Sequence, residues 1–236
     1  MNTLIIKIVT ALLLSITVFN AYTQGVSLSK TRIIFTGNSN SEIINITNDD
    51  NQPYLIQAGV TEKIDGQLSP HFLVTPPIFR LENKSSSSLR ILLKEAETLP
   101  DDKESIFYLN TKIIPSTSKY ENGSPTSKLV LVTNFVIKII YRPHLLADPT
   151  DDDYKKVLLK MQNKKWVFDN PTPYYLTVTS LKFDNDKYSQ AILLAPFSQT
   201  VIDREGSPVK QALWHIINDY GELSTEFKYQ EPVSYK

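Results

Sequence analysis

The residue types that most often carry catalysis are few and scattered in this sequence. There is no cysteine among the 236 residues, which removes thiolate nucleophiles, cysteine-based zinc sites and disulfides. The histidines, His71, His144 and His215, lie in separate segments without the spacing of a zinc site or a catalytic triad. The sequence holds no phosphate-binding, dinucleotide-binding or nucleophile-elbow motif, and nothing marks a glycosidase pair of carboxylates. We therefore expect a protein that is not an enzyme and that has no metal, no cofactor and no small-molecule substrate.

One charged residue stands inside a long apolar segment, where it needs an explanation. Leu129–Tyr141, with the sequence LVLVTNFVIKIIY, lacks glycine and proline and has about twice the usual length of a strand. Both sets of alternate positions are apolar, which is typical of a strand covered on both faces or lending one face to a partner. Lys138 interrupts this pattern. Because burying an unpaired ammonium group is costly, Lys138 either serves a partner or extends its charged end to the surface.

Short β-rich segments separated by turn residues precede this strand. Tyr54, Ile56, Ala58 and Val60 alternate with other residues, as a half-buried strand requires. The expected strands are Val26–Phe35, Glu42–Thr47, Tyr54–Thr61, Ser88–Leu93, Ile106–Ile114 and Leu129–Tyr141. Polar and turn-forming residues fill the intervals, and no helical periodicity of useful length appears. This spacing is typical of a β-sandwich.

A break after Tyr141 separates a second group of strands. Pro143 ends the long strand because proline lacks the backbone donor, and the acidic run Asp151–Asp153 is interpreted as a solvated linker or turn. Strands are then expected at Val157–Gln162, Trp166–Phe168, Tyr175–Phe183, Gln190–Leu194, Gln199–Asp203, Leu213–Ile217 and Thr225–Tyr229. The sequence therefore predicts an all-β protein of two domains, residues 25–143 and 144–236.

The N-terminal residues and the net charge indicate where the protein works. Lys7 precedes the apolar run Ile8–Phe19, which has the length of a signal-peptide core and is short for a membrane span. We expect residues 1–24 to be a cleaved signal peptide that directs export to a bacterial periplasm. Lys and Arg together number 25, as do Asp and Glu, so the chain lacks the basic field typical of nucleic-acid binders.

Several motifs resemble those of the periplasmic chaperones of chaperone–usher pili, the PapD-like family, in the same order and spacing. They are Val26–Phe35, Gln52–Ala58, Thr75–Pro77 with Phe79–Glu82, Leu99–Asn110, Phe135–Pro143, Asp169–Tyr175 and Ile217–Gly221. The resemblance covers essentially the whole mature chain. It implies two immunoglobulin-like β-sandwich domains set at an angle, L- or boomerang-shaped, with a cleft between them.

The resemblance also implies a function and the residues that carry it. The chaperone would bind, fold and cap pilus (fimbrial) subunits by donor-strand complementation and deliver them to the outer-membrane usher. Arg32 and Lys138 would bind the subunit's C-terminal carboxylate, which agrees with the strength of charge-assisted hydrogen bonds. Leu129, Leu131 and Thr133 match the residues that fill the subunit's groove, although a larger apolar residue is more usual at the position of Thr133.

A further group of charges matches the family's interdomain cluster. Glu104, Arg142 and Asp219 would hold the two domains at a fixed angle. The segment Ser116–Ser127 before the long strand is short, which resembles the short-loop branch associated mostly with rod-like pili. The chain differs from members that carry a disulfide in the second domain, because it has no cysteine.

Two other functions stay open on the sequence alone. A periplasmic adhesion or carbohydrate-binding β-sandwich would show clusters of solvent-facing aromatic side chains. A periplasmic hydrolase on a β scaffold would show clustered carboxylates or a histidine pair in one pocket. An exposed apolar strand also predicts some self-association of the free protein.

Overall fold

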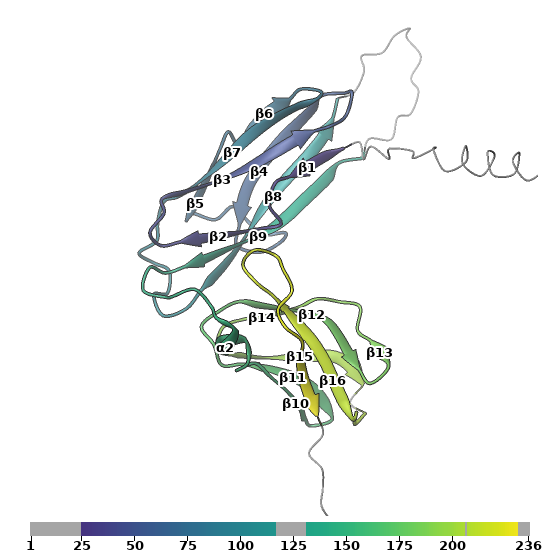
Figure 1. Ribbon diagram of the computed structural model, residues 1–236. Helices are drawn as coiled ribbons and strands as arrows, with labels where there is room; N and C mark the ends of the chain where they lie inside the picture. Colours follow the sequence, from purple (N-terminus) through teal and green to yellow (C-terminus); the bar gives the residue numbers. More distant parts are fainter. Residues whose placement is uncertain (1–24, 117–130, 206, 231–236) are drawn as a thin grey trace, which may run out of the picture.

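The computed structural model of the protein describes residues 25–116, 131–205 and 207–230. Within these ranges the strands build two β-sandwiches that meet at an angle (Figure 1). The predicted fold class, all-β with two immunoglobulin-like domains, is confirmed. The predicted signal peptide, residues 1–24, lies outside the described residues, as do residues 117–127 of the short segment before the long strand and Leu129. No helix in the described part of the chain is long and apolar enough to cross a membrane.

The first sandwich contains two sheets. One has the order β1 (Val26–Leu28), β3 (Ser41–Asn48), β7 (Ser85–Leu93), β5 (Phe72–Thr75). The other has the order β2 (Arg32–Thr36), β9 (Thr133–Arg142), β8 (Ser105–Pro115), β4 (Tyr54–Thr61), β6 (Ile78–Leu81). The expected alternation in β4 is confirmed, because Ile56, Ala58 and Val60 are buried while Leu55 and Gln57 are exposed. The core between the sheets includes Phe35, Ile44, Leu89, Leu109 and Ile139.

The first predicted strand, Val26–Phe35, is not continuous. Its first part, β1, pairs antiparallel with β3, and its second part, β2, pairs parallel with β9 in the other sheet. The chain changes sheets at residues 29–31, where the Ser29 amide donates a hydrogen bond of 2.9 Å to the Asn45 carbonyl. Apolar residues alternate in both parts, but the inward positions shift from Val26 and Leu28 in β1 to Ile33 and Phe35 in β2, so the phase of the alternation changes where the partner strand changes. The four-residue strands β5 and β6 were missed because they are short and flank a Pro-Pro pair.

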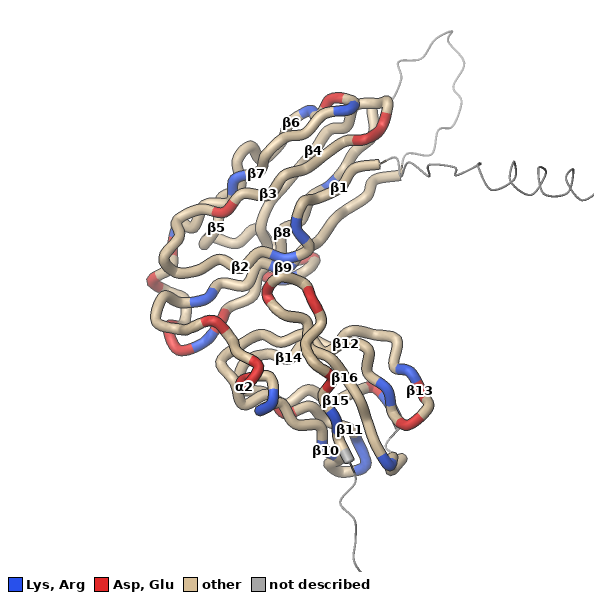
Figure 2. The backbone as a smooth tube through the Cα atoms, in the orientation of Figure 1, with Lys and Arg blue, Asp and Glu red and all other residues tan. Residues whose placement is uncertain are grey.

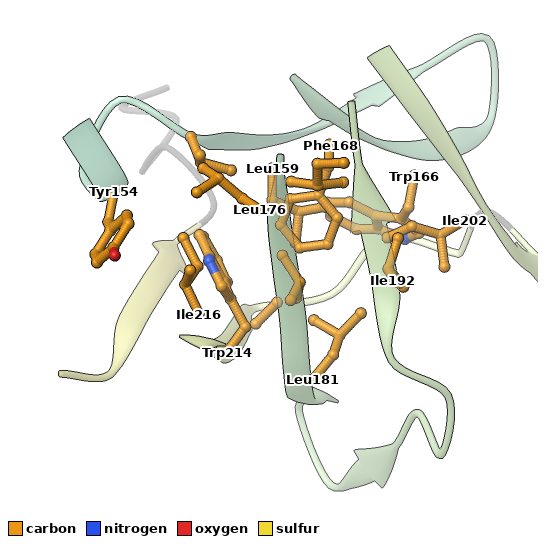
Figure 3. Packing of buried hydrophobic residues seen from close by; sticks show 14 of the residues in the cluster. Tyr154, Leu159, Trp166, Phe168, Leu176, Leu181, Ile192, Ile202, Trp214 and Ile216 are labelled. Carbon is orange, nitrogen blue, oxygen red and sulfur yellow. The ribbon is translucent and has the colours of Figure 1, made fainter. Parts of the chain in front are cut away.

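The second sandwich is smaller, and its core is rich in aromatic residues. One sheet contains β10 (Leu158–Gln162), β11 (Lys165–Asn170) and β15 (Ser198–Glu205). The other contains β13 (Asp186–Lys187), β12 (Leu176–Phe183), β16 (Gln211–Ile217) and β17 (Phe227–Gln230), with β14 (Ile192–Leu194) paired to β12. Phe168 and Trp214 meet edge-on with ring centroids 5.3 Å apart (Figure 3). Burial of such rings supplies stability in a chain without disulfides.

The connection between the sandwiches contains a turn at the acidic run, for which a solvated linker or turn was expected. The acidic run forms α2 (Asp151–Tyr154), a single helical turn. The Asp153 carboxylate accepts hydrogen bonds from the amide and the hydroxyl of Thr150, both at 2.9 Å, which starts the turn. Tyr154 is buried in the core of the second sandwich. The chain crosses between the sandwiches in the segment from β9 to α2.

Candidate functional site

The strand β9 has an edge that is open over half its length. On one side β8 pairs with it antiparallel from Thr133 to Tyr141. On the other side β2 pairs with it in parallel, but only from Lys138 to Arg142. In the described part of the chain, residues 133–137 therefore have no paired strand on the β2 side, because β1 belongs to the other sheet. An open edge of this kind presents free backbone donors and acceptors to a further strand.

The side chains along β9 pass from buried to exposed toward its N-terminal end. Ile139 is fully buried and Ile137 packs partly against the same core. On the same face of the strand, Thr133 is exposed and Leu131 is 74% exposed. One face of β9 therefore meets the protein's own core at one end and lies uncovered at the other.

The two cations predicted from the motifs lie at the point where the open edge ends. Arg32, the first residue of β2, is the direct register partner of Lys138 on β9. The Arg32 guanidinium donates from Nη1 to the carbonyl of Asn218 at 3.0 Å. Lys138 Nζ donates to Thr177 Oγ1 at 3.4 Å. Both side chains are partly buried and turn toward the second sandwich, so Lys138 does not simply extend into solvent.

The surroundings of these cations favour an anion. Arg32 Nε is buried and has no hydrogen-bond partner among the described residues. Desolvation, followed by the nearby charge of Arg32, lowers the pKa of Lys138 below its usual value. Desolvation also lowers the pKa of Arg32, and the charge of Asp219 opposes this. In the residues that the structure describes, neither cation forms an ion pair with a carboxylate, so an added carboxylate would offset their desolvation.

A second group of charges joins the two sandwiches. The Arg142 guanidinium binds the Glu104 carboxylate at 2.7 Å and Asp219 at 2.8 Å, so the structure brings the predicted cluster together. It also binds Asp148 at 2.6 Å, a contact that sequence reasoning missed. Glu104 accepts a hydrogen bond of 2.6 Å from the backbone amide of Tyr175 in the second sandwich. Figure 2 shows basic and acidic segments gathered where the two sandwiches meet.

Burial and charge pairing act against each other in this cluster. It raises the pKa of Glu104 to about 7, while the charge and hydrogen bonds of Arg142 act in the opposite direction. Burial alone would lower the pKa of Arg142, but its bonds to Asp219 and the charge of Glu104 raise it above the usual value. Arg142 and Glu104 therefore form a buried pair whose charges depend on each other.

A cavity of about 530 Å³ adjoins both groups of charges. Its lining residues are Ser29, Lys30, Thr31, Arg32, Ile34, Thr36, Arg142, Asp148, Asp219 and Tyr220. Two of the three histidines lie elsewhere: His71 contacts the carbonyl of Glu95, and His215 that of Ser224. Among the described residues, no group of three or more His, Cys, Asp or Glu side chains could hold a metal ion.

Comparisons with known families match almost the whole described chain. The model described as "Pili and flagellar-assembly chaperone, PapD N-terminal domain" matches residues 25–147. The model described as "Pili assembly chaperone PapD, C-terminal domain" matches residues 152–228.

Similar proteins of known role agree with these matches. The chaperone protein FimC of Escherichia coli K12 is 37% identical over 201 residues, which cover 85% of this chain and 82% of FimC. The chaperone protein HifB of Haemophilus influenzae is 34% identical, with 83% of this chain and 84% of HifB covered. The crystal structure of the periplasmic chaperone SfaE matches with a TM-score of 0.72 and 30% identity, covering 86% of this chain and 98% of SfaE. A chain from the complex of the Salmonella enterica SafA pilin with the SafB chaperone matches with a TM-score of 0.78 and 26% identity, covering 88% and 97% of the two chains.

Proposed function

The chain belongs to the PapD family of pili-assembly chaperones, and on that premise we propose that the open edge of β9, together with Arg32 and Lys138, is where it binds a pilus subunit. It is a periplasmic chaperone of pilus subunits. The comparisons do not favour an adhesion or carbohydrate-binding protein. The observation that carries the proposed site is a strand edge that is unfilled among the described residues and ends at two cations for which these residues supply no carboxylate partner.

The direction of the bound strand follows from this geometry. A subunit strand that fills the edge beside residues 133–137 and ends at Lys138 must run parallel to β9. It would lie in line with β2, which continues the same edge from Arg32 onward. Backbone hydrogen bonds to the edge supply affinity with little dependence on sequence. The bound strand would thereby extend the five-stranded sheet of the chaperone along the part of the β9 edge that β2 leaves open.

The cations fix the register of that strand. A terminal carboxylate placed between Arg32 and Lys138 accepts charge-assisted hydrogen bonds, including one from the orphaned Arg32 Nε. Each such bond to a charged group contributes about 1.5–3 kcal/mol. An internal segment of a protein has no carboxylate at this point, so the anchor selects the end of a chain.

The exposed end of β9 would supply the apolar contacts. Leu131 and Thr133, with Leu129 before the described part of the strand, would enter the subunit's groove and cover its core. Thr133 is smaller and more polar than a leucine, so the matching part of the groove would be shallow or polar. In the free protein this end of β9 is uncovered, and an exposed apolar surface of this kind favours self-association.

The remaining features support delivery of the subunit. We propose that Glu104, Arg142 and Asp219 hold the domains at the angle that places Arg32 beside the second sandwich. Residues 1–24 would be a cleaved signal peptide, the domain boundary would lie near residue 143, and an outer-membrane usher would receive the subunit. We expect no enzymatic activity and no need for a cofactor.

Co-purification with a pilin tests the site. The chaperone and a pilin encoded beside it are expressed together, and the soluble pilin bound to tagged chaperone is measured. Arg32→Ala and Lys138→Ala should each reduce the retained pilin about tenfold or more, since each removes charge-assisted bonds. Arg90→Ala and Lys182→Ala, at exposed positions away from the edge, are the matched controls. Retention by both anchor variants at the native level would refute the carboxylate site.

A further inference from the structure

The loop between β16 and β17 of the second sandwich lies beside the proposed anchor, Arg32 and Lys138. Its carbonyls at Ile217 and Asn218 accept hydrogen bonds from Arg32 Nη1, at 3.5 and 3.0 Å. In Figure 1 this loop rises from β16 and reaches the region of β2 and β9. The loop therefore lies against the start of β2, which is where the open edge of β9 ends. A strand bound along that edge would end directly in front of this loop.

Hydrogen bonds within the loop hold its shape. Asn218 Oδ1 accepts from the amides of Tyr220 at 3.0 Å and Glu222 at 2.9 Å. The backbone of Gly221 has a φ of +88°, a conformation that side chains disfavour, and a Cβ there would meet Thr31 Oγ1 at 3.4 Å. The loop is thus held by its own hydrogen bonds, and Gly221 packs close to Thr31 of the first sandwich. Its side chain at position 220 is presented from a fixed backbone.

Tyr220 is a residue of this loop whose side chain takes part in none of these contacts. Asn218 braces the loop and Asp219 binds Arg142, whereas the Tyr220 side chain is 89% exposed. In the part of the chain that the structure describes, its hydroxyl has no hydrogen-bond partner, and the residue lines the same cavity as Arg32. A large aromatic ring held out from a braced loop is typical of a binding contact, because tyrosine supplies much surface for little conformational entropy.

The position of the ring points to a particular part of the subunit. Arg32 and Lys138 lie on the face of the sheet that turns toward the second sandwich, as shown by their contacts with Asn218 and Thr177. Because side chains alternate along a strand, one of the last two residues of the bound strand must project from this same face. That side chain would lie between the sheet and the loop that carries Tyr220.

We propose that Tyr220 packs against the outward-facing side chain among the last two residues of the bound subunit and so selects subunits with an apolar or aromatic residue there. This inference rests on the proposed carboxylate anchor. The anchor cations recognise the free C-terminal carboxylate of the subunit, and Tyr220 recognises the type of side chain beside it.

A peptide series on the mature full-length chaperone tests this selection. The probes are fluorescent peptides of alternating valine and threonine whose last two residues are Thr-Phe, Phe-Thr or Gly-Gly, each with a free carboxylate or an amide. Binding is followed by fluorescence anisotropy. Tyr220→Ala should weaken binding of one of the two phenylalanine peptides about 3- to 10-fold, the range expected for an aromatic contact, and leave the Gly-Gly peptide unchanged. Tyr220→Phe keeps the ring and should bind as the native protein does.

The outcomes separate this inference from the proposed function. If Tyr220→Ala weakens all three peptides equally, or none, while amidation still weakens binding to the native protein, Tyr220 selectivity is wrong and the anchor stands. If amidation has no effect and Arg32→Ala binds normally, the anchor is wrong, and the inference falls with it. No measurable binding of any peptide to the native protein would overturn both.

Discussion

Removal of the Arg142 guanidinium should lower the free energy of unfolding, because the interdomain cluster depends on charge pairing. Its guanidinium is 3% exposed and binds Glu104, Asp148 and Asp219, whose side chains are 1%, 82% and 26% exposed. In an Arg142→Met variant the two aspartates can be hydrated, but Glu104 stays buried without its cation. Leaving one buried charge unpaired costs about 3–5 kcal/mol. We therefore expect the free energy of unfolding at pH 8 to fall by that amount.

A second substitution isolates the cause. In Arg142→Met combined with Glu104→Gln, the buried carboxylate is replaced by a neutral amide that can still accept the Tyr175 hydrogen bond. The double variant should therefore be more stable at pH 8 than Arg142→Met alone, by about 2 kcal/mol. If Glu104→Gln alone does not stabilise the native protein, this gain is non-additive and shows that the two residues interact.

The pH dependence has a defined sign. Burial raises the pKa of Glu104 to about 7 even with Arg142 present, and without Arg142 it should rise further. The folded state then holds a proton that the unfolded state releases near 4.5, so unfolding free energy falls as pH rises between these two pKa values. Lowering the pH from 8 to 6 should thus restore about 1–3 kcal/mol to Arg142→Met and much less to the double variant.

Urea unfolding followed by tryptophan fluorescence at pH 6, 7 and 8 measures these differences, with Arg90→Met as an exposed control. The reasoning is refuted if Arg142→Met loses less than about 1 kcal/mol, or if the double variant is no more stable than the single one.

Two further predictions concern the donor edge and the second core. Leu131→Asp should leave the unfolding free energy of the free chaperone within about 0.5 kcal/mol, because Leu131 is 74% exposed. The same change should abolish pilin co-purification, since it would bury a carboxylate in an apolar groove; normal retention would argue against that contact. Phe168→Ala, in the fully buried core of the second sandwich, should lower unfolding free energy by about 3–5 kcal/mol in calorimetry. A loss below about 1 kcal/mol would show that this core is not a main source of stability.

Local sequence patterns were sufficient to predict the positions of most strands. The alternation of Tyr54, Ile56, Ala58 and Val60 predicted β4 with its observed bounds and its buried face. The long apolar segment with its single lysine predicted β9 as an unusual strand without any information on its neighbours. Residue types along one strand report its faces well, because alternation is a local property.

Pairing between distant segments could not be predicted in this way. The change of sheet at residues 29–31 leaves the β9 edge open, and the sequence marks it only by a shift in the phase of alternation, from Val26 and Leu28 to Ile33 and Phe35, which does not identify the new partner strand. Asp148 belongs to a polar stretch typical of a solvated linker, so nothing marked it as a partner of Arg142. The grouping of Glu104, Arg142 and Asp219 came from family resemblance, since these residues are far apart in the chain. Tyr220 stood in a recognised motif, but its place beside Arg32 depends on how the two sandwiches meet.

Hydrogen–deuterium exchange of the chaperone alone and in complex with its pilin tests the central claim most directly. The account predicts that exchange in residues 133–137 slows strongly in the complex, because the subunit strand pairs with the open edge of β9. Exchange in β15, an edge strand of the second sandwich, should stay the same. Unchanged exchange in residues 133–137 of a stable complex would contradict strand pairing at this edge.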